Sequence, residues 1–407
     1  MTVHYGGIMT KPKRIVGLAG AASIVVVLNG CAGEPADQSG DPMSLVLADV
    51  LEGRIDGSTE PAAPAGALAL PFDDLPTVVG DDLIGPVHPD SGDDRLRFTV
   101  ISSRGDREWE VSTNPSCVGY TVSRTPSGAA VTILQSDASI DDGRLATRVA
   151  ASSYDIGSGA VRWGPQAVPG SLVAPGLVFG RPTNAVVGGA GGPHEVLDGA
   201  TGQPLLQVPD GVVVTERDGT IVLDDGSGAV VARQGDTGPS SWSSAAVRPA
   251  SVPPDAAATL VPEGGASGAA VTTISWTWPG DPNGLVTVHR ALDGALVGRP
   301  LSSRPAVMTT DAAGDVAAAV LPGGELIGLG TSGALWTSQP RVGWSSPVLD
   351  PSGTELIAMD GDEVVELDPG SGLEISRAVG LPVLLVTADG SRVLQGGAGL
   401  LLVPAGA

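Results

Sequence analysis

Two stretches near the C-terminal end of the chain match each other turn for turn. Residues 311–336 read DAAGDVAAAVLPGGELIGLGTSGALW, and residues 350–374 read DPSGTELIAMDGDEVVELDPGSGLE. Evenly spaced aspartates begin equivalent turns at Asp311, Asp350 and Asp389. The glycines of a second turn, Gly333 and Gly372, keep the same spacing as the aspartates. Two turns that recur in step indicate a repeated supersecondary unit.

The segments between the turns have the composition of β-strands, because short runs of β-branched residues and leucine end at Gly, Asp, Pro or Ser. Examples are residues 130–134, 211–215, 220–223 and 363–367. A repeat of about 40 residues with several strands and no helix is typical of a β-propeller blade. At roughly 40 to 50 residues per blade, the chain provides seven or eight blades. We predict an all-β propeller of about seven four-stranded blades.

Similar turns recur upstream at irregular intervals: residues 126–128, 155–159, 198–202, 209–211, 224–228 and 267–268. Asp155-Ile-Gly-Ser-Gly-Ala-Val-Arg-Trp163 and Thr331-Ser-Gly-Ala-Leu-Trp336 resemble the repeats of quinoprotein-like (PQQ-like) β-propellers, in which an Asp-x-x-Thr/Ser-Gly turn precedes a strand ending in Trp. The resemblance covers most of residues 105–400. It implies the fold more strongly than an activity, since one fold carries many functions. Outer-membrane assembly lipoproteins share these repeats.

The tryptophans at comparable strand ends are expected to pack between blades, where a large ring can fill the wedge that widens toward the rim. They are Trp109, Trp163 and Trp336. We expect the ring to be closed by an N-terminal strand within residues 96–101, pairing with the strands after Gly390, because an open propeller would leave strand edges exposed.

The N-terminal segment is typical of an export signal. Lys11, Lys13 and Arg14 precede an apolar run over residues 15–28, and Leu28-Asn29-Gly30-Cys31 resembles a lipobox. An uncleaved anchor helix is the alternative, but spanning a bilayer takes about 20 apolar residues and this run is shorter. We therefore predict a signal peptide over residues 1–30 and acylation of Cys31, for example with palmitate.

The remaining chain divides into two parts. Residues 31–65 are rich in Ala, Gly, Pro, Ser and acidic residues, which predicts a flexible tether behind the lipid anchor. Residues 66–407 form the predicted propeller. This organisation places the protein at the cell membrane, on its extracytoplasmic face, with the bilayer as one partner.

The charge and the cysteine content of the chain argue against two kinds of function, nucleic-acid binding and thiol chemistry. Both lysines lie in the signal peptide, so the mature chain has 19 arginines against 45 acidic residues, a net charge of −26 (19 − 45). Such a chain repels polyanions, so nucleic acid is not an expected partner. Once Cys31 carries lipid, Cys117 has no cysteine partner, and we expect it to be a buried strand residue rather than a reactive thiol.

No catalytic, cofactor-binding or metal-binding set is predicted. The resemblance to quinone enzymes would imply a vicinal cysteine pair, calcium ligands and a catalytic aspartate, and Cys117 alone cannot supply the pair. The sequence contains no G-x-S-x-G, C-x-x-C or H-E-x-x-H motif and no EF-hand loop. His88, His194 and His289 lie far apart in the sequence and are expected to be structural.

Three other motifs have a bland interpretation beside a functional one. The glycine-rich residues 188–192 have no helix after them, so they are expected to connect strands rather than hold a phosphate. Arg104-Gly105-Asp106 is expected to be a turn rather than an adhesion motif. The loop at residues 275–284 contains Trp276 and Trp278, which are the candidate binding residues. A single strand with one ring inward and one outward is the alternative.

These observations favour a membrane-anchored propeller that binds or scaffolds a protein or a cell-envelope polymer through its loops, without catalysis. The alternative is a propeller hydrolase or lactonase-type enzyme with a metal in the central channel. Only the acid-rich composition of the chain supports this alternative.

The first prediction concerns the anchor. Cys31→Ala should release the protein from membranes, because no other cysteine follows the apolar export segment directly. Membrane and soluble fractions are compared by immunoblot, with Cys117→Ala as the control that should stay in the membrane fraction. Unchanged membrane retention of the Cys31 variant would contradict lipidation.

Overall fold

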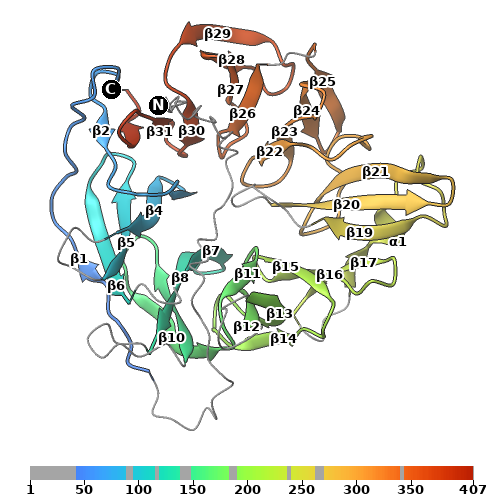
Figure 1. The fold of residues 1–407 in the computed structure, drawn as a ribbon, viewed down its shortest axis with the longest axis horizontal. Coiled ribbons are helices and arrows are strands. Elements are labelled where there is room, and N and C mark those ends of the chain that lie inside the picture. The colour runs from blue at the N-terminus through green and yellow to red at the C-terminus, as the bar shows by residue number, and fades with distance from the viewer. Residues whose placement is uncertain are drawn as a thin grey trace, which may run out of the picture.

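The computed structural model describes residues 43–88, 95–114, 119–137, 148–182, 190–235, 240–261, 270–339 and 343–406. In these ranges the strands form eight antiparallel sheets, set radially around one axis as the blades of a propeller (Figure 1). Apart from β1 and β2, which are added at the outer edges of two sheets, the strands of each sheet are neighbours in chain order and run from the axis outward. The all-β propeller prediction is confirmed.

Blades 1 to 3 are formed by the N-terminal part of the ring. Blade 1 contains β3 (Thr77–Val79), β4 (Asp82–Val87), β5 (Leu96–Ser102) and β6 (Arg107–Thr113), with β1 (Asp49–Val50) added outside β6. Blade 2 contains β7 (Tyr120–Thr125), β8 (Gly128–Ser136), β9 (Val149–Asp155) and β10 (Val161–Val168). Blade 3 contains β11 (Leu172–Ala174), β12 (Val178–Pro182), β13 (Ala190–Leu197) and β14 (Pro204–Gln207).

Blades 4 and 5 follow. Blade 4 contains β15 (Val213–Arg217), β16 (Thr220–Asp224), β17 (Val230–Gln234) and β18 (Ser240–Ser243), after which comes the helical turn α1 (Ser244–Val247). Blade 5 contains β19 (Ala257–Val261), β20 (Val271–Trp278) and β21 (Asp281–Arg290). Isolated bridges from Leu296 and Leu301 to β21 replace a regular fourth strand. No helix in the described ranges is long and apolar enough to cross a membrane.

Blades 6 to 8 complete the ring. Blade 6 contains β22 (Val307–Thr310), β23 (Val316–Val320), β24 (Leu326–Gly330) and β25 (Gly333–Thr337). Blade 7 contains β26 (Trp344–Leu349), β27 (Leu356–Asp360), β28 (Glu363–Leu367) and β29 (Glu374–Val379). Blade 8 contains β30 (Val383–Val386), β31 (Arg392–Gln395), β32 (Leu400–Val403) and, as its outer strand, β2 (Leu68–Ala69).

The predicted number of seven blades is therefore corrected to eight. Seven complete repeats separate the first strand of blade 1, which begins at Thr77, from the first strand of blade 8, which begins at Val383. The chain fits an eighth blade because that blade takes only three strands from the C-terminal end. Its fourth strand, β2, comes from the N-terminal side of the ring.

The repeated turns identified in the sequence occupy equivalent places. Asp311, Asp350 and Asp389 lie between the first and second strands of blades 6, 7 and 8. The Asp350 carboxylate accepts the main-chain N–H groups of Thr354 and Glu355, both at 2.7 Å, which fixes the turn. Two upstream equivalences were wrong: residues 209–211 connect blade 3 to blade 4, and the turn at residues 224–228 lies between the second and third strands of blade 4. Residues 267–268 lie outside the described residues.

A tryptophan on the outer strand of one blade packs into the turn between the third and fourth strands of the next blade. This happens four times in the described ranges: Trp109 on Gly159, Trp163 on Gly202, Trp242 on Gly294 and Trp336 on Gly372. The φ angles of these glycines are +68°, +70°, +72° and +69°. A Cβ at any of them would crowd or overlap the indole. Glycine is therefore required both for the left-handed backbone and for the ring's approach.

Each indole also donates a hydrogen bond to a main-chain carbonyl in the same turn. The acceptors are Ile156 for Trp109 at 2.7 Å, Gly199 for Trp163 at 2.9 Å, Ala291 for Trp242 at 2.9 Å and Pro369 for Trp336 at 2.7 Å. The predicted packing of tryptophans between blades is confirmed. We call each of these contacts a tryptophan joint; they connect blades 1 to 2, 2 to 3, 4 to 5 and 6 to 7.

Other joints use polar groups. Between blades 3 and 4, the buried Glu216 carboxylate accepts the N–H groups of Leu177 at 3.0 Å and Gly219 at 2.7 Å. Arg290 forms an ion pair with Asp315 between blades 5 and 6. Arg392 pairs with Glu366 at 2.8 Å between blades 7 and 8.

The ring closes between blades 8 and 1 through residues 43–70, which we call the strap. Leu68 and Ala69 pair with Leu402 and Leu401. The strand predicted to close the ring, within residues 96–101, instead lies within β5 of blade 1. Closure by an N-terminal strand is confirmed, but that strand is β2, which was too short to stand out in the sequence.

The strap continues along the rim of blades 1 and 2. Asp49 and Val50 pair with β6, and the Val46 carbonyl accepts the Tyr154 hydroxyl at 2.8 Å. The strap includes part of the range expected to be a tether, residues 31–65. The hydrogen-bonded part of the chain therefore begins before residue 66.

Removing one indole N–H should weaken a tryptophan joint. Trp109→Phe keeps an aromatic ring but leaves the Ile156 carbonyl without its donor in a buried site, so we expect a loss of about 1–3 kcal/mol in the free energy of unfolding. Urea unfolding measures it. Trp278→Phe is the control: Trp278 is half-buried and docks into no described turn of a neighbouring blade, and its loss should stay below about 1 kcal/mol. Equal losses would contradict the joint.

The polar joint between blades 3 and 4 should depend on pH. Burial raises the pKa of Glu216 above its ordinary value of 4.5. The folded state therefore takes up this proton at a higher pH than the unfolded state, and acidification between the two pKa values stabilises the folded wild type. Relative to Glu216→Gln, the wild type should gain stability from pH 7.5 to pH 5 in urea unfolding. A difference that is constant with pH would contradict this assignment.

Candidate functional site

One end of the ring carries the described turns between the first and second strands of the blades. Because successive strands run antiparallel, the turns between third and fourth strands lie at this end too. We call it the turn face; it includes Gly80, Asp311, Asp350 and Asp389. Since the first strands are innermost, their turns surround the mouth of the central channel.

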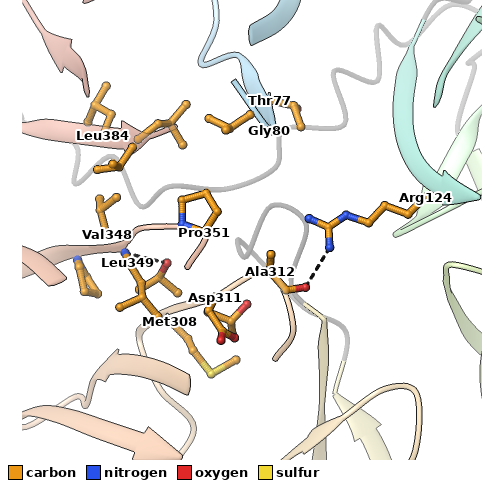
Figure 2. Close-up of a pocket in the computed structure, with 16 residues that line it drawn as sticks. Thr77, Gly80, Arg124, Met308, Asp311, Ala312, Val348, Leu349, Pro351 and Leu384 are labelled. Carbon is orange, nitrogen blue, oxygen red and sulfur yellow. Dashed lines mark hydrogen bonds between the residues drawn. The ribbon is translucent and has the colours of Figure 1, made fainter. Parts of the chain in front are cut away.

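A pocket of about 130 Å³ opens in this channel, between the innermost strands of blades 6, 7, 8 and 1 (Figure 2). Its wall is mostly apolar and is contributed by Val78, Met308, Pro347, Val348, Pro351, Leu384, Leu385 and Val386. Polar groups on the wall come from Thr77, Thr309 and Thr310. The Thr309 hydroxyl oxygen accepts the Leu349 N–H at 3.3 Å, so its own O–H remains able to donate.

Arg124 reaches this pocket from the opposite side of the ring (Figure 2). It lies in β7 of blade 2, and its Nη1 donates to the carbonyl of Ala312 in blade 6 at 3.1 Å. Its main-chain N–H donates to the Asp218 carboxylate at 2.8 Å. One residue therefore connects blades 2, 4 and 6 at the channel mouth. Asp218 holds the left-handed conformation (φ +48°) that presents its carboxylate there.

The carboxylates around the mouth are bound by their own turns. Asp311, the one carboxylate among the described residues that lines the pocket, is nearly buried, and its Oδ1 accepts the Asp315 N–H at 2.9 Å. Hydrogen bonds from Ser352 and from turn N–H groups hold the pKa of Asp350 below its ordinary value against the opposing effect of burial. Hydrogen bonds, chiefly from Thr387 and Ser103, similarly lower the pKa of Asp389 to about 2, although burial opposes this. The carboxylates of Asp350 and Asp389 therefore stay ionised, and all three aspartates accept hydrogen bonds within their turns.

The pocket therefore combines an apolar wall with a guanidinium that has donors to spare, an arrangement suited to holding a small amphiphilic group. In the described ranges no three His, Cys, Asp or Glu side chains lie close enough together to hold a metal ion. Arg124 was missed in the sequence, because its significance depends on a contact between residues 188 positions apart.

The predicted binding residues lie elsewhere, in blade 5. Trp276 is 1% exposed within the core, and its Nε1 donates to the Thr287 hydroxyl oxygen at 2.7 Å. Its ring is therefore not presented to a partner. Trp278 is half-buried at the end of β20, and residues 275–284 form a strand end and a hairpin rather than a ridge. Both rings pack on the same core cluster, Trp276 within it and Trp278 partly buried against it, so the arrangement with one ring inward and one outward is not observed either.

The three histidines do not converge. His289 is fully buried, with Nδ1 2.9 Å from the Gly294 carbonyl and Nε2 2.8 Å from the Thr287 hydroxyl. His88 pairs with Asp73 at 2.9 Å, and His194 lies in β13. None of the three is among the described residues that line the channel pocket.

The other motifs also find their places. Arg104-Gly105-Asp106 forms the turn between β5 and β6, covered by Leu68 and Ile55 of the strap. The described part of the glycine-rich stretch, residues 190–192, belongs to β13. Residues 188 and 189, Cys31 and Cys117 lie outside the described residues.

No family model and no curated protein sequence matches the chain. Among solved structures, BamB from Moraxella catarrhalis is similar at 17% identity over 84% of this chain and 96% of that one, with a TM-score of 0.42. The computationally designed Ika8 protein matches at 12% identity over 81% and 97%, with a TM-score of 0.45. Sqt1 from Saccharomyces cerevisiae matches at 15% identity over 83% and 99%, with a TM-score of 0.41. With values this low, the fold assignment rests on the strand pairing.

Proposed function

We propose that this protein is a lipid-anchored, extracytoplasmic propeller that binds a protein or a cell-envelope polymer without catalysing a reaction. The observation that carries the proposal is the turn face, where a pocket with an apolar wall and a spare guanidinium opens among hydrogen-bonded turns. A propeller face of this kind presents loops from every blade on a rigid frame, which suits recognition.

Exposed apolar side chains on the same face support a binding role. Leu292 is 59% exposed in the turn of blade 5 between Arg290 and Gly294, and Leu373 is 69% exposed beside the corresponding turn of blade 7. Large apolar residues placed on turns contribute nothing to the core and are available to a partner.

The strap supports the proposed anchoring. A lipid on Cys31 would stand a short stretch of chain before Met43, the first described residue of the strap. An extended chain spans at most about 3.3–3.6 Å per residue, which gives this stretch a reach of about 40 Å. Because the strap runs along the rim of blades 1 and 2, an anchor attached there would leave the turn face accessible.

We also propose that the chain is a PQQ-like repeat protein. The tryptophan joints support this, because the Asp-x-x-Ser-Gly turn and the strand-ending tryptophan that suggested the resemblance are partners in one contact across neighbouring blades. The tether is proposed to be the chain between Cys31 and the strap. No described contact favours the metal-dependent hydrolase alternative.

Site-specific crosslinking tests the binding role. A photoreactive residue at Leu292 or Leu373 of the full-length protein in intact cells should give a discrete crosslinked product, at least fivefold above that from Asp225. Asp225 is the control because it is exposed in a turn between second and third strands, at the opposite end of the ring. Products of equal yield from both ends, or none from either, would contradict the proposal.

A further inference from the structure

Among the described residues the guanidinium of Arg124 has no carboxylate partner, in contrast to five other arginines. Ion pairs with Asp or Glu hold Arg148, Arg162, Arg290, Arg377 and Arg392. Among the described residues, the Arg124 guanidinium donates one hydrogen bond, to the Ala312 carbonyl, although the sequence has 45 acidic residues. Because a guanidinium has five N–H donors, four remain for another acceptor at the channel mouth.

Two carboxylates at the channel mouth accept hydrogen bonds from main-chain N–H groups rather than from the Arg124 guanidinium. Asp218 accepts from the main-chain N–H of Arg124, and in the described residues it makes no ion pair with the side chain. Asp311 accepts the main-chain N–H groups of Asp315 and Val316 at 2.9 and 3.3 Å. Their negative charges are offset by main-chain amides, so within the described chain no ion pair compensates the Arg124 charge.

The wall facing Arg124 defines the rest of the ligand. Val348, Pro351 and Leu384 present apolar surface on the far side of the pocket (Figure 2). The pocket has a volume of about 130 Å³, which limits the ligand to a small group. A group of this size can combine one planar anionic end with a short aliphatic body. A large or multiply charged anion would also meet repulsion from the acidic surface.

We propose that the channel binds the carboxylate of a short aliphatic acid or peptide terminus, with Arg124 pairing with the carboxylate and the wall of blades 6 to 8 holding the aliphatic part. This inference rests on the proposed binding function. A planar guanidinium fork matches a carboxylate in two parallel hydrogen bonds, which an alcohol or an amide cannot reproduce. The Thr309 hydroxyl, on the same wall, supplies a further donor.

Calorimetric titration of the detergent-solubilised full chain tests this with pentanoate and, as its uncharged counterpart, pentan-1-ol. Pentanoate should bind saturably and at least tenfold more tightly than the alcohol. Arg124→Gln should remove at least tenfold of the pentanoate affinity, and Arg124→Lys should lose less because it keeps the charge. Arg248→Gln is the matched control, since the Arg248 guanidinium also donates to a main-chain carbonyl, that of Pro254, away from the channel.

A second titration distinguishes the two sources of the carboxylate. A short peptide ending in valine, with a free carboxylate, is compared with the same peptide as its amide. Tighter binding of the free peptide than of pentanoate would identify a chain terminus as the ligand, and the reverse would identify a small acid; either result supports the proposal. Urea unfolding shows whether Arg124→Gln is folded. If it is not, the proposal is tested on the wild type alone, by comparing the acid with the alcohol and the free peptide with its amide.

The inference is overturned if neither carboxylate binds saturably, if the alcohol and the amide bind as well as the acids, or if Arg124→Gln and Arg248→Gln leave the pentanoate affinity equally unchanged. If the titrations fail in this way but the crosslinks from the turn face are still formed, only the proposed channel ligand is wrong. Loss of the crosslinks as well would remove the proposed binding function.

Discussion

An indole held between a left-handed glycine and a main-chain carbonyl of the neighbouring blade sets the geometry of this ring. A twisted sheet packed against its neighbour leaves a wedge that widens toward the rim, and a tryptophan on the outer strand fills it while its N–H satisfies a carbonyl in the adjacent turn. The contact fixes both the distance and the angle between blades, because ring packing and hydrogen bond must be satisfied together. Four joints use it, and others use a buried glutamate, ion pairs or the strap.

Much of this fold could be predicted because the decisive signals are local. The turn at Asp350 is fixed by its own next residues, so its sequence repeats wherever the turn repeats. The missing parts depend on contacts between distant segments. Leu68 and Ala69 close the ring with only two paired residues, which give no strand pattern to recognise. Trp242 escaped notice because its turn begins at Arg290 rather than at an aspartate.

The candidate site could not be predicted for the same reason. Arg124 looks like an ordinary polar strand residue in the sequence, and its position at the axis opposite Ala312 follows only from the ring. Trp276 shows the opposite case, since two tryptophans near a hairpin suggested a contact surface, whereas the ring of Trp276 completes the core beside Trp242. Composition describes the surface on average, but the channel is shaped by strands that are far apart in the chain.

The pairing of β2 with β32 has a consequence for the order in which the ring is completed. β2 precedes β3, the innermost strand of blade 1, in the sequence, yet its partner, Leu400–Val403, follows the other seven blades. During synthesis, seven blades can form while the two parts of the eighth remain apart. Among the described strands this is the longest-range pairing, and its loop-closure entropy must be overcome last. Until β2 and β32 pair, each presents an unpaired strand edge. The chain is therefore most open to aberrant pairing after blade 1 has formed and before blade 8 is complete.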